Sequence, residues 1–119
     1  MNEFTRYLHE VFQDFGAISV RKMFGGYGIY HDGLMFALVA DDTLYLKVDD
    51  STKQQFIDKD LSPFEYHKSG KIILMPYYLA PEEIYDDPDE AVYWARLAFQ
   101  AALNSKAGKN WETTLLFCQ

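Results

Sequence analysis

The sequence has 119 residues, of which 49% are hydrophobic, and this size and composition predict one compact domain with a single core. Its 18 acidic and 11 basic residues give a net charge of −7, which disfavours autonomous DNA binding because nucleic-acid affinity rests largely on cations that neutralise phosphates. Cys118 is the only cysteine, which excludes an intrachain disulfide and a thiolate zinc cage and favours a reducing compartment.

The N-terminal segment predicts an amphipathic helix. Apolar side chains recur at spacings of three and four, forming one stripe that ends at Gly16: Phe4, Tyr7, Leu8, Val11, Phe12 and Phe15. This segment lacks the basic start of a signal peptide, and no apolar run in the sequence approaches the ~20 residues needed to cross a bilayer. We therefore expect a cytoplasmic protein.

Residues 18–48 change to short β-rich runs, "ISVRKMF", "YGIYH", "LMFALVA" and "TLYLKV", which predict an antiparallel meander. Two tight-turn signals separate the later runs: Asp32-Gly33 and Asp41-Asp42. In the last run Leu44 and Leu46 share one face. Tyr45 and Lys47 point to the other face, so we expect one face of the sheet to be packed and the other to meet solvent.

A short helix is predicted over residues 51–58, with Asp50 or Ser51 accepting the free N–H groups of its first turn. Two further strands, "PFEYHK" and "KIILMPYY", flank a hairpin turn at Ser69-Gly70. Pro76 in the second of these strands cannot donate a hydrogen bond to a sheet. We expect it to end the pairing or to lie on an edge.

Two helices are predicted in the C-terminal part. Pro81 opens a short helix, and the cap at Asp87 with the following proline announces a long helix over residues 88–105. Gly108 is expected to stop that helix. Residues 104–119 are then expected to form a C-terminal tail whose apolar side chains dock on the domain or on a partner.

The long helix has a wide apolar arc. A ridge of small residues with one tryptophan is flanked by larger apolar side chains: Ala91, Trp94, Ala95, Ala98 and Ala102, beside Val92, Phe99 and Leu103. Small residues let a helix approach a neighbour closely. We expect the arc to pack inside the domain, and the alternative is a second subunit. The arc and the apolar tail together predict a homodimer.

The order of elements predicts an α+β fold, with an antiparallel sheet of about five strands and helices packed on it, because connections this short exclude parallel crossovers. No repeat, linker or low-complexity segment interrupts residues 1–119, which we expect to be one domain.

The stretch "RKMFGGYGIY" contains three glycines, but their spacing does not match a dinucleotide fingerprint and a strand follows them rather than a helix. No Gly-Lys-Ser/Thr of a phosphate-binding loop occurs in the sequence. Glycines that permit a turn, a bulge or a close approach between strands are the favoured interpretation.

No residues are predicted to be catalytic, to bind a cofactor or to bind a metal, so we do not expect an enzyme. His9, His31 and His67 lack metal-ligand spacing. The acidic pairs lie where Asp caps turns and helices: Asp41-Asp42, Asp49-Asp50 and Asp86-Asp87. No serine lies in a nucleophile-elbow motif.

One constellation could form a contact surface. Five cations fall in the strand regions and could gather with tyrosines for phosphate or base contacts: Arg21, Lys22, Lys47, Lys68 and Lys71, with Tyr27, Tyr45 and Tyr66. Arg21 and Lys22 point to opposite faces if their strand is regular. At most part of this set can therefore share a face, and ordinary solvated strand positions are the favoured interpretation.

The chain resembles the TfoX N-terminal domain family over almost its whole length, from about residue 6 to residue 103. The resemblance rests on an ordered series of short motifs: Arg21, Met23-Phe24-Gly25 and Gly28, Phe36-Ala37, Leu44-Tyr45-Leu46-Lys47, Pro63-Phe64, Tyr77-Tyr78, and Trp94-Ala95 after an acid-Pro-acid helix start. It implies a small α+β domain of the TfoX-N/YgaC type, similar to secretion-chaperone-like domains, which are often dimeric.

Two-domain members of that family, TfoX or Sxy, regulate competence genes in bacteria as coactivators that act with the cyclic-AMP receptor protein. The resemblance therefore implies a noncatalytic transcription regulator that contacts a transcription factor or RNA polymerase. The candidate contact residues are Arg21, Lys22, Tyr45 and Lys47. The alternative is a small-ligand-binding or enzymatic domain whose pocket is lined by tyrosines: Tyr27, Tyr30, Tyr66, Tyr77 and Tyr78.

Overall fold

The fold is a six-stranded antiparallel sheet with helices, seen in a computed structural model that describes residues 2–23 and 25–116, with side chains up to residue 105. The strands are β1 (Ser19–Met23), β2 (Gly26–His31), β3 (Leu34–Ala40), β4 (Thr43–Lys47), β5 (Pro63–Lys68) and β6 (Lys71–Leu79). The helices are α1 (Glu3–Val11), α2 (Lys53–Ile57), the 3-10 turn η1 (Glu82–Tyr85) and α3 (Pro88–Leu116). The predicted α+β class is confirmed, with six strands in place of about five.

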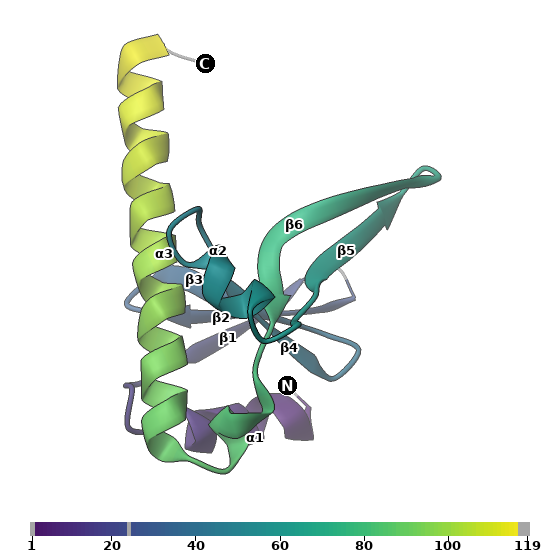
Figure 1. The fold of residues 1–119 in the computed structure, drawn as a ribbon, viewed down its shortest axis with the longest axis vertical. Helices are drawn as coiled ribbons and strands as arrows, with labels where there is room; N and C mark the ends of the chain where they lie inside the picture. The colour runs from purple at the N-terminus through teal and green to yellow at the C-terminus, as the bar shows by residue number, and fades with distance from the viewer. Residues whose placement is uncertain (1, 24, 117–119) are drawn as a thin grey trace.

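The strand order is β1-β2-β3-β4-β6-β5, so β6 inserts between β4 and β5. Helix α3 lies along β3 and β4 and contacts η1 (Figure 1). The C-terminal half of α3 extends beyond the sheet, and the β5–β6 hairpin projects from the body as a second protrusion (Figure 1). The helices therefore leave one face of the sheet uncovered.

Three two-residue turns connect the hairpins, and all six central residues have a positive φ: Asp32 and Gly33, Asp41 and Asp42, Ser69 and Gly70. Positive φ at both central positions is what a type I′ turn requires, and its twist matches that of the flanking strands. The three predicted turns are therefore confirmed.

The glycines of "GGYG" permit a close approach of two strands. A Cβ on Gly26 would lie 2.1 Å from the carbonyl oxygen of Val39 on β3, and a Cβ on Gly28 would lie 2.7 Å from the Met23 sulfur. No side chain fits at the first of these positions without a shift of the backbone. The favoured interpretation of this stretch is confirmed.

The core lies between the helices and the covered face of the sheet. Phe12, directly after α1, meets Phe36 of β3 with ring centroids 5.6 Å apart, and Leu46 of β4 is fully buried. All five residues of the predicted ridge of α3 are buried as well: Ala91, Trp94, Ala95, Ala98 and Ala102. The chain itself thus buries this ridge, as the intramolecular interpretation predicted.

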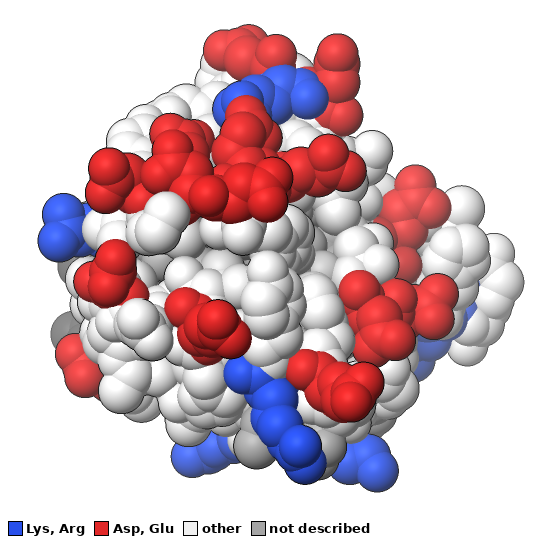
Figure 2. All heavy atoms as spheres, turned by 90° about the horizontal axis from the view of Figure 1, so that it is seen from below, with Lys and Arg blue, Asp and Glu red and all other residues white. Residues whose placement is uncertain are grey.

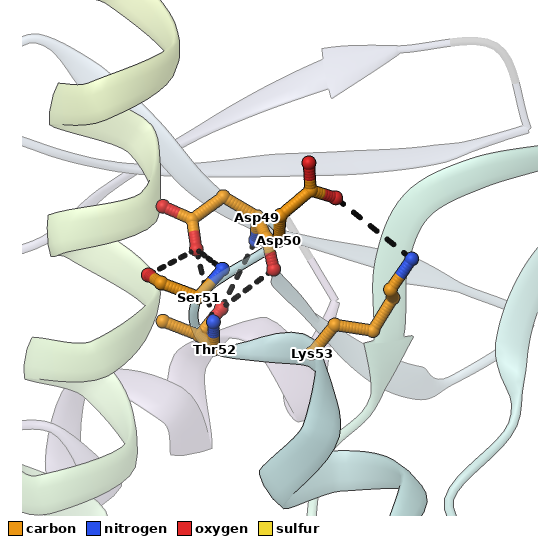
Figure 3. A network of polar contacts seen from close by, with 5 residues as sticks. All are labelled: Asp49, Asp50, Ser51, Thr52 and Lys53. Carbon is orange, nitrogen blue, oxygen red and sulfur yellow. Dashed lines mark hydrogen bonds and ion pairs between the residues drawn. The ribbon is translucent and has the colours of Figure 1, made fainter.

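The loop between β4 and α2 is organised by Asp49 (Figure 3). Its carboxylate accepts hydrogen bonds from the backbone N–H groups of Ser51 and Thr52 at 2.9 and 3.0 Å, and its second oxygen accepts one from the Asn104 amide of α3 at 2.9 Å. The predicted cap residues were wrong, because Thr52 occupies the N-cap position of α2 without a side-chain capping hydrogen bond, while Asp50 faces Lys53 at 3.9 Å. Asp49 thereby connects the sheet, α2 and α3.

Two predicted helix boundaries also differ. Helix α1 ends at Val11, because the chain then tightens into turns up to Phe15. Gly108 does not stop α3, because a single helical glycine costs only ~1 kcal/mol and the helix runs on to Leu116. Pro76 lies within β6, and the pairing of β6 with β4 covers Tyr77–Leu79 and ends beside it, so the predicted end of pairing is confirmed. Its missing N–H also falls where the pairing with β5 shifts register.

The predicted docking of residues 104–119 falls largely outside the described side chains and stays a prediction. Within the part of the chain that the structure describes, no helix combines the length and apolarity needed to span a bilayer.

Candidate contact surface on the open face of the sheet

The pairing register assigns each strand residue to a face, because residues directly opposite in antiparallel strands share one. Leu44 and Leu46 lie on the covered face with their partners Val39 and Ala37. The residues that alternate with them form the open face, which we define by Arg21, Met23, Gly28, Tyr30, Leu38, Tyr45, Lys47 and Tyr77.

The predicted contact residues divide between the two faces. Arg21 lies opposite Gly28 on the open face, and Lys22 lies opposite Tyr27 on the other side of the same strand. Tyr45 and Lys47 lie on the open face opposite Leu79 and Tyr77 of β6. The structure thus brings Arg21, Tyr45 and Lys47 to one face and separates Lys22 from them.

Each cation of the open face lies against an aromatic ring. The Arg21 guanidinium is 4.9 Å from the centroid of the Tyr30 ring, and the Lys47 ammonium is 5.1 Å from that of Tyr77. Such pairs contribute ~0.5–1 kcal/mol at exposed sites and hold a long side chain in one position. Both cations are therefore placed on the sheet with restricted freedom.

Tyr77 lies close-packed within this surface. Only 8% of its side chain is exposed, although no helix covers this face. Burial raises the pKa of Tyr77 to about 12, and the neighbouring Tyr30 adds to the shift. The phenol therefore stays neutral at physiological pH and can serve as a hydrogen-bond donor or acceptor.

The charge of the open face is opposite to that of the whole chain. None of the described strand residues of β1, β2, β3 and β4 is acidic. Acidic side chains gather instead at the end of the molecule formed by α1, η1 and the start of α3 (Figure 2): Glu3, Glu10, Asp14, Glu82, Glu83, Asp86, Asp87 and Asp89. A chain of net charge −7 thus presents a locally cationic, aromatic face.

A hollow of about 310 Å³ adjoins this face, between the sheet and the β5–β6 hairpin. Its lining is mainly apolar and includes Met23, Leu38, Phe64, Tyr66 and Met75. Phe64 also contacts Tyr45, with ring centroids 5.0 Å apart. The sequence did not predict that Phe64 and Met23 belong to this surface. The β5–β6 hairpin curls toward β1 and β3, and the alternation of residues along a strand carries no signal for such a curl.

The five tyrosines proposed to line one pocket do not meet. Tyr27 and Tyr66 line the hollow, whereas Tyr30 and Tyr77 lie elsewhere on the open face. Tyr78 lies on the covered face and contacts Phe56, with ring centroids 5.9 Å apart. A single pocket lined by all five is therefore wrong.

The remaining polar candidates have local structural partners. The His31 ring nitrogen Nδ1 lies 2.7 Å from the Ala17 carbonyl oxygen, and Asp87 accepts the backbone N–H of Asp89 at 2.9 Å. Among the described residues, no three His, Cys, Asp or Glu side chains group closely enough to hold a metal ion.

The residues that carry the family resemblance lie at turn, surface and core positions. Gly25 occupies the β1–β2 turn with a φ of 62°, and Phe24 beside it lies outside the described residues. Trp94 is 3% exposed and packs edge-on against Phe56 at 4.9 Å, while its indole N–H donates to Glu90 at 3.2 Å. Of this signature, Gly28 and Tyr77 belong to the open face.

Comparison with known proteins agrees with this fold. The chain is 28% identical over 95 residues to Protein Sxy of Escherichia coli (strain K12). The aligned region covers 80% of this chain and 46% of that protein. This chain thus spans about half the length of that relative. The sequence also matches the TfoX N-terminal domain over residues 10–102, well over half of the chain. The chain therefore belongs to the TfoX N-terminal domain family.

Proposed function

We propose that this protein is a noncatalytic regulator of competence gene transcription that acts by contacting a transcription factor, such as the cyclic-AMP receptor protein. Membership of the TfoX N-terminal domain family is the observation that carries the proposal. The similarity to Protein Sxy supports the same role. RNA polymerase is the second candidate partner.

The open face is the proposed contact surface. Arg21 and Lys47 are held against Tyr30 and Tyr77, so little side-chain freedom is lost when a partner binds them. Aromatic residues and arginine are enriched at the energetic centres of protein interfaces. A partner surface with carboxylates and apolar side chains fits this face best.

Protein contact is favoured over independent DNA binding. Two cations on one face neutralise few phosphates, and the net charge of −7 repels a polyanion at longer range. An acidic coactivator reaches a promoter more readily through a protein that is already bound there. The protein would then act in a complex with DNA without reading the bases itself.

A noncatalytic role accords with the chemistry of the described residues. The carboxylates of Asp49 and Asp87 accept backbone N–H groups, and His31 contacts a backbone carbonyl. These groups serve local structure, and we assign none of them a reaction. Recognition is then the function, and the protein is expected in the cytoplasm with its partner.

Direct binding to purified cyclic-AMP receptor protein tests the proposal, by calorimetry with and without a competence promoter. A variant that combines Arg21→Glu with Lys47→Glu removes both cations of the open face. Lys22→Glu makes the same charge change as either single substitution, on the opposite face of the strand that carries Arg21, and is the control for each of them. We expect the double variant to lose at least about tenfold in affinity, or ~1.4 kcal/mol, and the control to bind like the parent.

A pull-down from native lysate, read by mass spectrometry, extends the test to RNA polymerase. Failure to recover either transcription component, with or without promoter DNA, counts against the regulatory role. Equal loss of binding in the Lys22→Glu control rejects the open face as the contact surface while leaving the regulatory role standing.

A second candidate function is binding of a small apolar ligand in the hollow next to the β5–β6 hairpin. Its volume of about 310 Å³ lies at the lower end of ligand pockets. Thermal shift of the parent against Tyr66→Ala, screened with small aromatic compounds, tests this idea. A shift that the variant abolishes supports a ligand site, and no shift with any compound rejects it.

A further inference from the structure

The outer part of the β5–β6 hairpin, residues 64–75, forms an arm that projects from the domain (Figure 1). Residues 67–74 of the arm are all exposed. Three consecutive large apolar side chains lie among them: Ile72 is 60% exposed, Ile73 42% and Leu74 61%. The other exposed large apolar side chains of the described residues lie singly in the sequence, so a run of three is unusual on this surface.

The arm has only two strands. β4 pairs with β6 at Tyr77, Tyr78 and Leu79, so the earlier part of β6 pairs with β5 alone. A two-stranded ribbon is marginally stable in water, and three or more strands are normally needed. Its unpaired backbone groups and apolar side chains also form a template on which another strand can add.

The two outer strands of the sheet differ as templates. β1 carries the adjacent cations Arg21 and Lys22, a common way to keep a sheet edge from pairing. β5 carries Glu65 and His67 two residues apart, with their side chains 3.7 Å apart on one face of the arm. β5 therefore presents a carboxylate and an imidazole that a second copy of itself can match.

We propose that two copies of this chain pair antiparallel through β5, with Tyr66 on the two-fold axis. Residues opposite each other must share a face, so a symmetric pairing can be centred on Glu65, Tyr66 or His67. Centring on Tyr66 places each Glu65 opposite His67 of the second copy and each Phe64 opposite Lys68. Centring on Glu65 sets the two Glu65 carboxylates against each other. Centring on His67 forms neither the Glu65–His67 pair nor the Phe64–Lys68 pair.

The pairing joins two marginal ribbons into one four-stranded sheet in the order β6-β5-β5-β6. Ile72 and Leu74 lie on the same face as Glu65 and His67, because they are their partners in the β5–β6 ladder. Apolar side chains of both copies then share one face of a wider sheet. This interface is formed by β5, whereas Arg21 and Lys47 of the open-face contact proposed above lie on β1 and β4.

Site-specific cross-linking tests the pairing and its register in a chain whose sole cysteine is removed by Cys118→Ser. In this background Tyr66→Cys places two thiols directly opposite each other, at a spacing that allows a disulfide. Glu65→Cys places them diagonally, which is too far. Arg21→Cys at the β1 edge is the matched control. We expect a disulfide-linked dimer under mild oxidation with Tyr66→Cys, at least about tenfold faster than with the other two.

A swap series tests the Glu65–His67 pairs without relying on one substitution. Glu65→Lys removes the carboxylate acceptor opposite His67, and we expect it to raise the dimer dissociation constant about tenfold in sedimentation equilibrium. Adding His67→Glu sets opposite charges against each other and is expected to restore the parent affinity. Circular dichroism of each variant verifies that the domain is folded.

A monomeric mass for the parent by light scattering at every accessible concentration overturns the proposal. Equal cross-linking at Tyr66→Cys and Arg21→Cys overturns it as well. A dimer that the double variant fails to restore rejects the Tyr66-centred register, and with it the pairing proposed here.

Discussion

The two faces of the sheet differ in their contacts, although both arise from the same alternation of residues along the strands. On the covered face Leu44 and Leu46 meet helices of their own chain and are almost fully buried. On the open face Tyr45 and Lys47, from the same strand, lie beside Phe64 and Tyr77. One strand thus supplies both a core and a surface.

The difference lies in what completes each face. The covered face is completed within the chain, so its residues account for stability. The open face is organised by contacts between aromatic rings and cations, and Arg21 and Met23 on it are exposed, so a partner can reach it. Substitutions on the two faces should therefore separate stability from binding, and four predictions test that separation.

The largest effect is expected on the covered face from Trp94→Ala. Trp94 is 3% exposed and packs against Phe56, so its truncation leaves a cavity and is expected to lower the free energy of unfolding by about 3–5 kcal/mol. Arg96→Ala, at an exposed position of the same helix, is the control and should stay within ~0.5 kcal/mol. Urea denaturation measures both, and similar values for the two would contradict the assignment of the core.

The second effect is expected at high pH from Tyr77, which is buried although it lies on the open face. Its pKa of about 12 exceeds the ordinary tyrosine value, so the neutral phenol is favoured in the folded state. The stability this provides is fully present below pH ~10 and is lost as the pH rises toward 12, by about 2–3 kcal/mol.

Comparison of the parent with Tyr77→Phe isolates this contribution, because Tyr85 also has its pKa raised to about 12 by burial and titrates in both proteins. The variant should lose less stability between pH 10 and 12. Parallel stability curves for the two proteins would show that Tyr77 is solvated and that the open face is less compact than described.

The third effect, of ~1 kcal/mol, is expected from Asp49→Ala, which removes the acceptor for two backbone N–H groups between the sheet and α2. Burial alone would raise the pKa of Asp49, but hydrogen bonds from Asn104, Ser51 and Thr52 outweigh it and lower the pKa. The resulting stability is present above the ordinary aspartate pKa and is lost as the pH falls through the lowered value.

Asp49→Asn keeps a carbonyl acceptor but does not titrate, so its stability should depend less on pH than that of the parent below pH ~4. Urea midpoints in acidic buffers measure this difference. An identical acid dependence in both proteins would show that the carboxylate is not held by the hydrogen bonds seen in Figure 3.

The smallest effect on stability is expected from the variant that combines Arg21→Glu and Lys47→Glu. Each substitution removes one cation–π contact, worth ~0.5 kcal/mol where solvent screens it, so the total change should stay near 1 kcal/mol. The same variant is expected to lose binding to the transcription factor. A large loss of stability would show that the open face belongs to the core energetics, and the proposed division of the two faces would fail.

Local signals in the sequence predicted much of the fold. Glycine and aspartate at the three hairpin turns accept a positive φ, and the alternation of Leu44, Tyr45, Leu46 and Lys47 assigns their faces correctly. The apolar spacing of α3 also predicted its buried ridge. These features depend on residues that are neighbours in sequence, and local geometry alone determines them.

Features that depend on distant segments were predicted less well. The insertion of β6 between β4 and β5 has no local signal, and the role of Asp49 in the loop before α2 depends partly on Asn104 of α3. Gly108 was expected to end α3 because its local propensity favours a stop, but the cost of one helical glycine is small beside the cooperativity of a long helix.

The sequence by itself determined the family, the two-sided character of the sheet and the separation of Arg21 from Lys22, because each depends on residue identity and a period of two. Only the tertiary structure decided that Arg21, Tyr45 and Lys47 share a face with Tyr77, and that Phe64 joins them. Strand order and the curl of a hairpin set those contacts, and both result from packing between segments far apart in the chain.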